Sequence, residues 1–498
     1  MDEILTYGLA NDETGRGVGC VVKDGVRFEP SSAGFIDYLT VSPGNRFDYE
    51  SVWRNQKNDV HPPLYYAVIH TVCSLTPGRF SIWSAGIVNI ICALFVLHYT
   101  IKIAEEFTQN RFYLNLLKTT FILCAGMLSA VSFFRMYVMA MLWVTWITCV
   151  LIRVFRYKQT KKFYFCLFAL ALCGGLTHYY CIVYLFFISV VYGMILLYEK
   201  QWKQAVAFIL TMATAGGCAL AVFPAMVAHI LFSGHGTGSV ERLGHTSLSE
   251  TWSRLKTYFG FLDTQIFGRL FLVIICFGII LKIVVLTSGK QDTVENIGKC
   301  ISDRHMIYRW LLLVLPGFLY FLVIAKTATY VTDRYIFPIY AVAFVSFTLS
   351  IISIAEKIFS GCPAALLVCA LFSVMIVHNF QDTTWDYLFR SAESILNEAE
   401  THAAVDCIYI YKTEWKALPD FYEISRYKSV TFIKDSSPES LSGLMIAEPL
   451  ELIVLMEKDM DEEHIKNIID NYPYLNQYEK TGEFGYTATW RLYREQQQ

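Results

Sequence analysis

Long apolar stretches recur along the first 380 residues of this chain, and they restrict its fold more than any other feature. About twenty consecutive apolar residues are needed to cross the hydrocarbon core of a bilayer as a helix. The sequence is 55% hydrophobic and 17% charged, which a bilayer explains better than one large soluble core. We therefore predict a multi-pass membrane protein with about ten transmembrane helices. The stretches are Ile82–Ile101, Thr119–Phe134, Tyr137–Ile152, Phe163–Thr177, Tyr179–Leu197, Ala205–Phe232, Leu270–Leu286, Trp310–Ala325, Tyr335–Ile354 and Pro363–Val377.

Charge and cysteine content exclude several classes of function. The formal net charge is −2 and no polybasic run occurs, so there is no electrostatic reason to expect a nucleic-acid partner. The fourteen cysteines include no CxxC pair, and most lie within apolar runs. Neither a zinc ribbon nor a disulfide framework is indicated.

The loops between the apolar stretches differ in basic residues, and this difference predicts the orientation. Cytoplasmic loops of membrane proteins carry an excess of lysine and arginine. Alternate loops here are rich in both, and we expect these loops to be cytoplasmic. The N-terminal segment, the loop Ser233–Arg269 and everything after Asn379 are then extracytoplasmic. The basic group comprises Lys102, Arg111, Lys118, Arg153, Arg156, Lys158, Lys161, Lys162, Lys200, Lys203, Lys290, Lys299, Arg304 and Arg309.

The pattern predicts a polytopic all-α membrane domain followed by a soluble α/β domain. We expect an outer-face loop with juxtamembrane helices over residues 1–81 and the transmembrane domain over 82–380. An amphipathic linker over 381–403 then leads to a soluble extracytoplasmic domain over 404–498. In that tail, strand-like runs alternate with helical patterns. The strands are expected at Cys407–Tyr411, Ser429–Ile433, Leu450–Met456 and Tyr486–Tyr493, and the helices near Ala417–Tyr427 and at Asp461–Asn471.

Ionisable and polar residues lie beside the predicted helix ends on the expected outer face. Such a gathering on one side is what a single site at the membrane surface requires. The strings are Asp2-Glu3, Asp59-Val60-His61-Pro62-Pro63-Leu64-Tyr65-Tyr66, Arg135-Met136-Tyr137, Thr177-His178-Tyr179-Tyr180, the loop residues His235, Glu241, Arg242 and His245, and Lys326 with Asp333-Arg334-Tyr335-Ile336-Phe337-Pro338.

These strings resemble the C-type superfamily of polytopic membrane glycosyltransferases. The likeness is to the branch, called family 39, of bacterial protein O-mannosyltransferases and the lipid A aminoarabinose transferase. It is carried by Asp2-Glu3, the string from Asp59 to Tyr66, Arg135-Met136-Tyr137 and Arg334-Tyr335-Ile336-Phe337-Pro338. Members of this superfamily begin with a transmembrane helix before the acidic pair. Because this sequence starts at that pair, the resemblance implies that a first helix precedes it.

The resemblance implies transfer of a sugar, with inversion, from a polyprenyl-phosphate donor to an extracytoplasmic acceptor in the bacterial cell envelope. Such a reaction needs a base for the acceptor hydroxyl and cations for the departing phosphate. The resemblance assigns the role of base to Asp2. It assigns to Glu3 or Asp59 the role of orienting Asp2 or of holding a divalent metal ion. Arg135 and Arg334 are the phosphate ligands. Further substrate-binding candidates are His61, Tyr137, Arg242, Lys326 and Tyr335, and the metal candidates are Glu3, His235 and His245.

Other interpretations stay open at this point. The chain can be a transporter or lipid flippase, although transporters place ionisable groups near the bilayer midplane. It can also be a polysaccharide ligase or polymerase that uses a lipid diphosphate donor. Asp2 and Glu3 can cap a helix, and Arg135 and Arg334 can anchor helices at the headgroups. The histidines at 178, 235 and 245 fit ordinary interface or loop positions.

Overall fold

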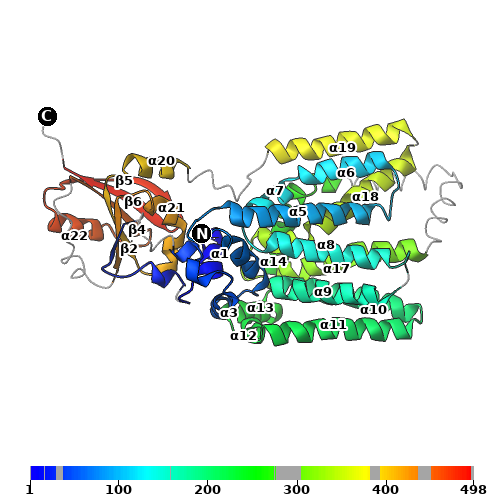
Figure 1. Ribbon diagram of the computed structural model, residues 1–498. Helices are drawn as coiled ribbons and strands as arrows, with labels where there is room; N and C mark the ends of the chain where they lie inside the picture. Colours follow the sequence, from blue (N-terminus) through cyan, green and yellow to red (C-terminus); the bar gives the residue numbers. More distant parts are fainter. Residues whose placement is uncertain are drawn as a thin grey trace. The chain divides into compact units, whose positions relative to one another are not determined.

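The computed structural model describes residues 2–15, 17–29, 37–157, 159–273, 275, 304–359, 361–381, 393–435 and 450–494. The chain divides into two compact units. The helical unit comprises residues 59–65 and 86–388, and the sheet unit comprises residues 1–58, 66–85 and 389–498 (Figure 1). Each unit is considered separately below.

The helical unit is a bundle of long apolar helices (Figure 1). Among the described residues, six helices are long and apolar enough to cross a membrane, and the bent pair α6 and α7 makes a seventh candidate. A multi-pass membrane protein is thereby supported, while the count of ten stays a prediction. The helices are α5 (Trp83–Ala104), α6 (Arg111–Ile122), α7 (Ala125–Ser132), α8 (Tyr137–Arg153), α9 (Lys161–Thr177), α10 (Tyr179–Tyr198), α11 (Trp202–Val222), α12 (Ala225–Leu231), α13 (Gly234–His245), α14 (Leu248–Gln265), α17 (Arg304–Thr327), α18 (Tyr340–Ile358) and α19 (Cys362–Gln381).

Two predicted spans are interrupted, for reasons that lie in the backbone. The stretch Thr119–Phe134 bends by 49° between α6 and α7. The stretch Ala205–Phe232 ends its helix at Val222, because Pro224 lacks the N–H that a continuing helix needs. Most of the predicted span Leu270–Leu286 lies outside the described residues, as do positions 382–392 of the predicted linker.

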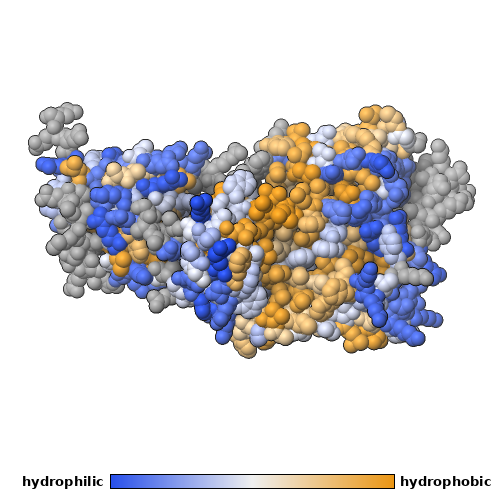
Figure 2. All heavy atoms as spheres, in the orientation of Figure 1, coloured by the Kyte–Doolittle hydropathy of each residue, from blue (hydrophilic) through white to orange (hydrophobic). Residues whose placement is uncertain are grey.

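Apolar side chains cover the outside of the helical unit. Leu94, Phe186, Ile209 and Leu366 are exposed, although they belong to long helices. Figure 2 shows hydrophobic residues as a broad orange band over these helices, with hydrophilic residues at the helix ends beyond it. A surface this apolar is compatible with lipid rather than with water.

The sheet unit contains a six-stranded mixed sheet in the order β1-β3-β2-β4-β6-β5. Strands β2, β3 and β4 are parallel, and the outer strands pair antiparallel. A small α/β sheet region formed mainly by the C-terminal part of the chain is therefore present, with two strands that the sequence analysis did not predict, β1 and β5. The elements are α1 (Asp2–Asn11), β1 (Arg27–Phe28), α3 (Tyr49–Asn58), α4 (Leu64–Cys73, shared between the units), α20 (Glu393–Thr401), β2 (Asp406–Tyr411), α21 (Phe421–Ile424), β3 (Ser429–Lys434), β4 (Glu451–Glu457), α22 (Glu463–Asn471), β5 (Gln477–Phe484) and β6 (Thr487–Tyr493), with 3-10 turns at Gly17–Cys20, Pro43–Asn45 and Glu414–Asp420.

The central strand β2 is buried on both faces, so its residues alternate between two cores. Tyr409 belongs to a core that also contains Ile4 and Val22 from the N-terminal segment. Ile408 packs in the other core with Ile465 of α22. The N-terminal residues thus cover one face of a sheet formed mainly by the C-terminal part of the chain.

Two carboxyl groups are buried in the sheet unit with raised pKa values. The Oδ2 atom of Asp420 accepts hydrogen bonds from Tyr409 Oη at 2.7 Å and Thr487 Oγ1 at 2.9 Å. Within the described ranges, no hydrogen bond reaches its Oδ1 atom. Burial raises the pKa of Asp420 to about 7. Burial, and then the charge of Asp420, raise the pKa of Glu423 to about 7 as well.

We expect the sheet unit to lose stability as the pH rises from about 4 to about 7, the interval between the unfolded and folded pKa values of these two groups. The folded unit holds these protons at pH values where the unfolded chain has released them, so stability is present at low pH and falls as pH rises. Asp420→Asn keeps the group neutral at every pH and should remove on the order of 4 kcal/mol of this loss, because the pKa of Asp420 rises by about three units on folding. Pulse proteolysis of the purified chain across this pH range measures the stability of the parent and of Asp420→Asn. Asp470→Asn, which changes an exposed aspartate, is the control. Equal pH dependence in the parent and in Asp420→Asn would contradict the expectation.

Candidate active site

A bend before α8 positions Arg135 and Tyr137. The side-chain amide of Asn89, on α5, donates to the backbone carbonyls of Val131 at 3.2 Å and Phe133 at 2.9 Å. Tyr65 Oη donates to Asn89 Oδ1 at 3.1 Å, which fixes the amide. Helix α7 has ended at Ser132, so these carbonyls lack helical partners, and Asn89 bonds both of them. The Phe133 carbonyl also accepts from the backbone N–H of Arg135 at 2.7 Å. The bend is therefore fixed by buried side chains, and it places Arg135 in a buried position.

Asp59 and His61 form a close pair at the start of the helical unit. Asp59 Oδ2 lies 2.6 Å from His61 Nδ1, and both side chains are less than one-fifth exposed. Burial opposes ionisation of Asp59. The charge and hydrogen bond of His61, together with the charge of the Arg135 guanidinium, favour ionisation and outweigh the effect of burial. The pKa of Asp59 therefore lies below its ordinary value. At neutral pH this carboxylate is ionised and stays close to a cation, Arg135.

His178 lies between α9 and α10, at the centre of this cluster. Its Nδ1 atom accepts a hydrogen bond from the backbone N–H of Tyr180 at 3.0 Å and so caps α10. Its ring centroid lies 5.2 Å from that of Tyr137 and 6.0 Å from that of His61. Burial, followed by the charges of His61, Arg135 and Arg334, holds the pKa of His178 well below its ordinary value. The ring is therefore neutral at pH 7 and carries its proton on Nε2.

A 3-10 helix, η3 (Asp333–Ile339), carries Arg334 and Tyr335 into the same cluster. Asp333 Oδ2 accepts from Gln265 Nε2 at 2.8 Å, and its Oδ1 accepts from the backbone N–H of Arg334 at 2.7 Å. Tyr320 Oη donates to the backbone carbonyl of Tyr335 at 2.6 Å. These contacts from α14 and α17 hold the short helix in place.

The guanidinium of Arg334 is packed among aromatic rings. Its Cζ atom lies 5.8 Å from the ring centroid of Phe133 and 5.6 Å from that of Tyr335. The Tyr335 ring in turn lies 5.2 Å from that of Tyr180. Stacked guanidinium groups keep their charge beside apolar surface and present a planar set of donors.

Six predicted site residues from distant parts of the sequence therefore meet at one end of the helical unit. We call this set, together with His178 and Tyr180, the arginine-histidine cluster. The six predicted members are Asp59, His61, Arg135, Tyr137, Arg334 and Tyr335.

Other predicted site residues are not placed in this cluster by any described contact. Arg242 of α13 pairs with Glu250 of α14 at 3.6 Å. Lys326 lies in the last turn of α17, and His245 is exposed at the end of α13. The side chain of His235 lies outside the described residues. Asp2 and Glu3 form the first turn of α1 in the sheet unit, and their site role stays a prediction.

The sequence analysis gave His178 no role, although it is the residue that the other members of the cluster surround. A signal was available, because Thr177-His178-Tyr179-Tyr180 repeats the position of Arg135-Met136-Tyr137 one hairpin later. Both strings stand at the start of an apolar helix, α8 or α10. Two such starts on the same side of a bundle are expected to be neighbours.

No group of three or more His, Cys, Asp or Glu side chains suited to a metal ion occurs among the described residues. A divalent ion stays a prediction. The cluster nevertheless combines two guanidinium groups, a neutral imidazole N–H and an ionised carboxylate paired with a histidine. Such a set can bind an anion and accept a proton.

Comparison with known proteins gives little information on identity. The chain matches no protein-family model, and no curated protein matches it. The crystal structure of ArnT from Cupriavidus metallidurans in the apo state is similar at a TM-score of 0.48 and 8% sequence identity, over 98% of this chain and 96% of that one. Agreement at this level describes a loosely shared chain path and identifies neither family nor activity.

Proposed function

We propose that the chain is an integral-membrane glycosyltransferase that moves a sugar from a polyprenyl-phosphate donor to an extracytoplasmic acceptor, with inversion. The observation that carries the proposal is the meeting of Arg135, Arg334 and the Asp59–His61 pair around neutral His178. These groups lie at one end of helices with membrane-spanning length and composition. A reaction on a lipid-linked phosphate needs this location, because the phosphate stays at the membrane surface.

The proposed step balances with these residues alone. The acceptor hydroxyl oxygen attacks the anomeric carbon as the bond from that carbon to the phosphate oxygen breaks. The electron pair of the broken bond stays on the phosphate, where Arg135 and Arg334 stabilise the added charge. The hydroxyl proton passes to a carboxylate base. The neutral His178 Nε2–H is a further donor for the phosphate or for a sugar hydroxyl.

Two carboxylates are proposed for the base. Asp2 is supported by the family resemblance of the acidic pair. Asp59 is supported by its place in the cluster and by its ionised state. Its partner His61 orients it, as the third member of a catalytic triad orients its neighbour.

An apolar cavity supports a polyprenyl donor. It occupies about 610 Å³ between α14, α17 and α18. Ile339, the last residue of η3, borders it, so the cavity adjoins the segment that carries Arg334. Aromatic rings form much of its wall, including Phe259, Phe271, Phe318, Phe321 and Phe347. An isoprenoid chain placed here would extend from a phosphate held at the arginine-histidine cluster.

Replacing Asp2 and Asp59 in turn by asparagine shows which of the two carboxylates is the base. An amide of equal shape cannot accept the proton, so loss of the base should lower sugar transfer by roughly 100-fold or more without loss of donor binding. If Asp59 is the base, Asp59→Asn shows this loss and Asp2→Asn does not, and the reverse holds for Asp2. Turnover of lipid-linked sugar by purified protein is the measurement. Parental activity in both variants would remove the proposed mechanism.

A further inference from the structure

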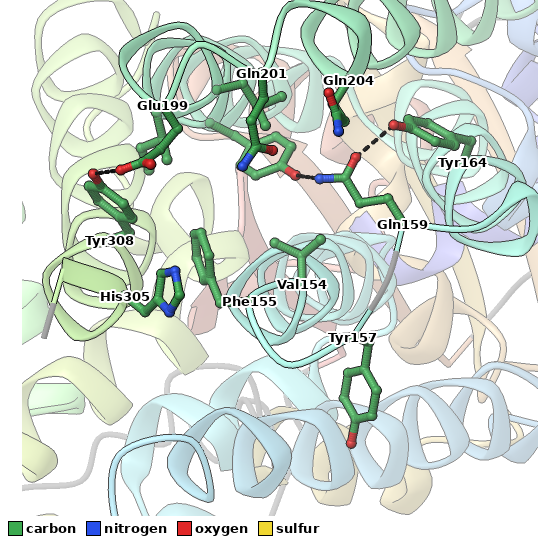
Figure 3. A pocket seen from close by; sticks show the side chains of 13 residues that line it. Val154, Phe155, Tyr157, Gln159, Tyr164, Glu199, Gln201, Gln204, His305 and Tyr308 are labelled. Carbon is green, nitrogen blue, oxygen red and sulfur yellow. Dashed lines mark hydrogen bonds between the residues drawn. The ribbon is translucent and has the colours of Figure 1, made fainter.

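A second cavity lies at the opposite ends of the helices that carry the arginine-histidine cluster. It has a volume of about 480 Å³ and is bordered by α10, α11 and α17 together with residues that follow α8 and residues at the start of α9 (Figure 3). Helix α10 begins at Tyr179, next to His178, and ends at Tyr198, next to the cavity residue Glu199. Twenty helical residues extend about 30 Å, so the cavity and the cluster face opposite sides of a membrane.

Among the described residues, the polar groups that line the cavity are amides, hydroxyls, the His305 imidazole and the Glu199 carboxylate. Gln159 Nε2 donates to Tyr192 Oη at 2.9 Å, and Gln159 Oε1 accepts from Tyr164 Oη at 2.6 Å. The carboxylate of Glu199 accepts from Tyr308 Oη. Figure 3 shows the side chains of Gln201 and Gln204 beside these bonded groups. Among the residues drawn there, no hydrogen bond engages either of the two amides.

Rings and aliphatic side chains form the rest of the lining. Phe155 stacks on His305 with ring centroids 5.4 Å apart and 21° between the planes. The ring centroid of Tyr308 lies 5.7 Å from that of Phe155. Val154 and Leu196 are buried at the edge of the same cavity. An apolar wall with a few convergent polar groups is the usual composition of a small-molecule site, and the volume lies in the range of such sites.

The lining chemistry selects among ligand classes. Among the described lining residues there is no lysine or arginine, and Glu199 contributes a carboxylate, so a phosphate or other anion is disfavoured. A glutamine amide both donates and accepts hydrogen bonds, so it matches ligand groups that can also donate and accept them. Hydroxyl groups are of this kind, and the C–H faces of a sugar ring match the aromatic rings.

We infer that this cavity binds an uncharged sugar ring on the membrane face opposite the arginine-histidine cluster, with Gln201 and Gln204 as ligands of its hydroxyl groups. The ring can belong to a free sugar or to the headgroup of a glycolipid. The inference does not depend on the proposed transferase activity, because none of the residues that line the cavity belongs to the cluster.

Saturation-transfer NMR on the full chain in nanodiscs tests the inference, with phospholipids and no sugar-based detergent. Glucose and N-acetylglucosamine serve as free sugars, octyl β-glucoside as the lipid-like form, and glucuronate as the anionic comparison. We expect signal from the neutral compounds and weaker signal from glucuronate. If octyl β-glucoside alone binds, the source is a glycolipid, whereas equal binding of free glucose indicates a soluble sugar.

The double variant Gln201→Leu with Gln204→Leu should weaken this binding about tenfold, because two hydrogen-bonding side chains are removed. Gln109→Leu, which changes an exposed glutamine outside the cavity, should bind as the parent does. The single change Gln201→Leu is the second variant if the double variant loses its thermal stability. Parental binding in the variants, or preferred binding of glucuronate, would overturn the inference.

Discussion

Arg334→Ala is expected to lower sugar transfer by about 100-fold, and to weaken retention of undecaprenyl phosphate in native mass spectrometry. A fixed positive charge beside a departing phosphate stabilises the transition state most strongly, because negative charge grows on the phosphate there. Loss of one such contact costs about 100-fold in turnover. The side chain is partly buried beside the Phe133 and Tyr335 rings. Arg135→Ala should have an effect of the same order.

Arg334→Lys separates charge from geometry, since an ammonium group keeps the charge and loses the planar pair of donors. Its turnover should lie between those of the parent and the alanine variant. Arg111→Ala is the matched control, because this exposed arginine begins α6 and contacts no described member of the cluster. Parental turnover and phosphate retention in folded Arg334→Ala would make this residue a membrane anchor.

Glu106→Ala is expected to destabilise the helical unit by about 3 kcal/mol, because it leaves basic side chains without their buried partner. Glu106 is 3% exposed. Its carboxylate lies 3.3 Å from Arg153 Nε, 2.8 Å from Arg156 Nε and 3.6 Å from an Arg309 guanidinium nitrogen. These contacts connect Glu106, the second residue after α5, to the ends of α8 and α17.

Thermal unfolding in detergent measures this effect, and Glu105→Ala is the matched control. Glu105 is the adjacent residue, but it pairs only with Lys102 among the described residues, and about one-third of its side chain is exposed. Its loss should cost less than about 1 kcal/mol. Equal melting temperatures for the two variants would show that the arginines find other partners when Glu106 is absent.

The same contacts bear on the predicted orientation. Arg153, Arg156 and Arg309 all belong to the basic group expected in the cytoplasm, and they meet at Glu106. Arg135 and Arg334, which lie beside helix ends on the expected outer face, meet near His178 at the opposite end of α8. The alternation of basic loops therefore sorts the helix ends into two sets, and the identity of the cytoplasmic set stays a prediction.

Hydrophobic pattern was enough to locate most helices and the buried strands. Strands β2, β3 and β4 are largely buried and rich in apolar residues, and the structure places each within one residue of its predicted start. Strand β5 was missed because Gln477–Phe484 lies at the sheet edge and is largely polar and exposed, so burial leaves no periodic signal there. Strand β1 has only two residues, and its pairing with β3 is a contact across more than four hundred positions.

The candidate site was predictable where a residue type itself carries the chemistry, as for Arg135 and Arg334. His178 could not be found by type, because one histidine at a helix start fits many positions. The place of its string at a helix start is a local signal, but its contacts with Tyr137 and His61 are tertiary and are not encoded in that string. The breaks in the predicted spans likewise depend on single residues such as Pro224 rather than on mean hydropathy.

Release of undecaprenyl phosphate from a panel of undecaprenyl-phosphate sugars is the most direct test of the proposed activity, since this product is common to every sugar and acceptor. The purified chain should release it from at least one donor in the presence of membrane acceptors. Arg334→Ala should reduce that release about 100-fold, and Arg111→Ala should leave it unchanged. If the folded parent releases no undecaprenyl phosphate from any donor, or Arg334→Ala releases it at the parental rate, the transferase assignment is contradicted and a transporter becomes the better interpretation.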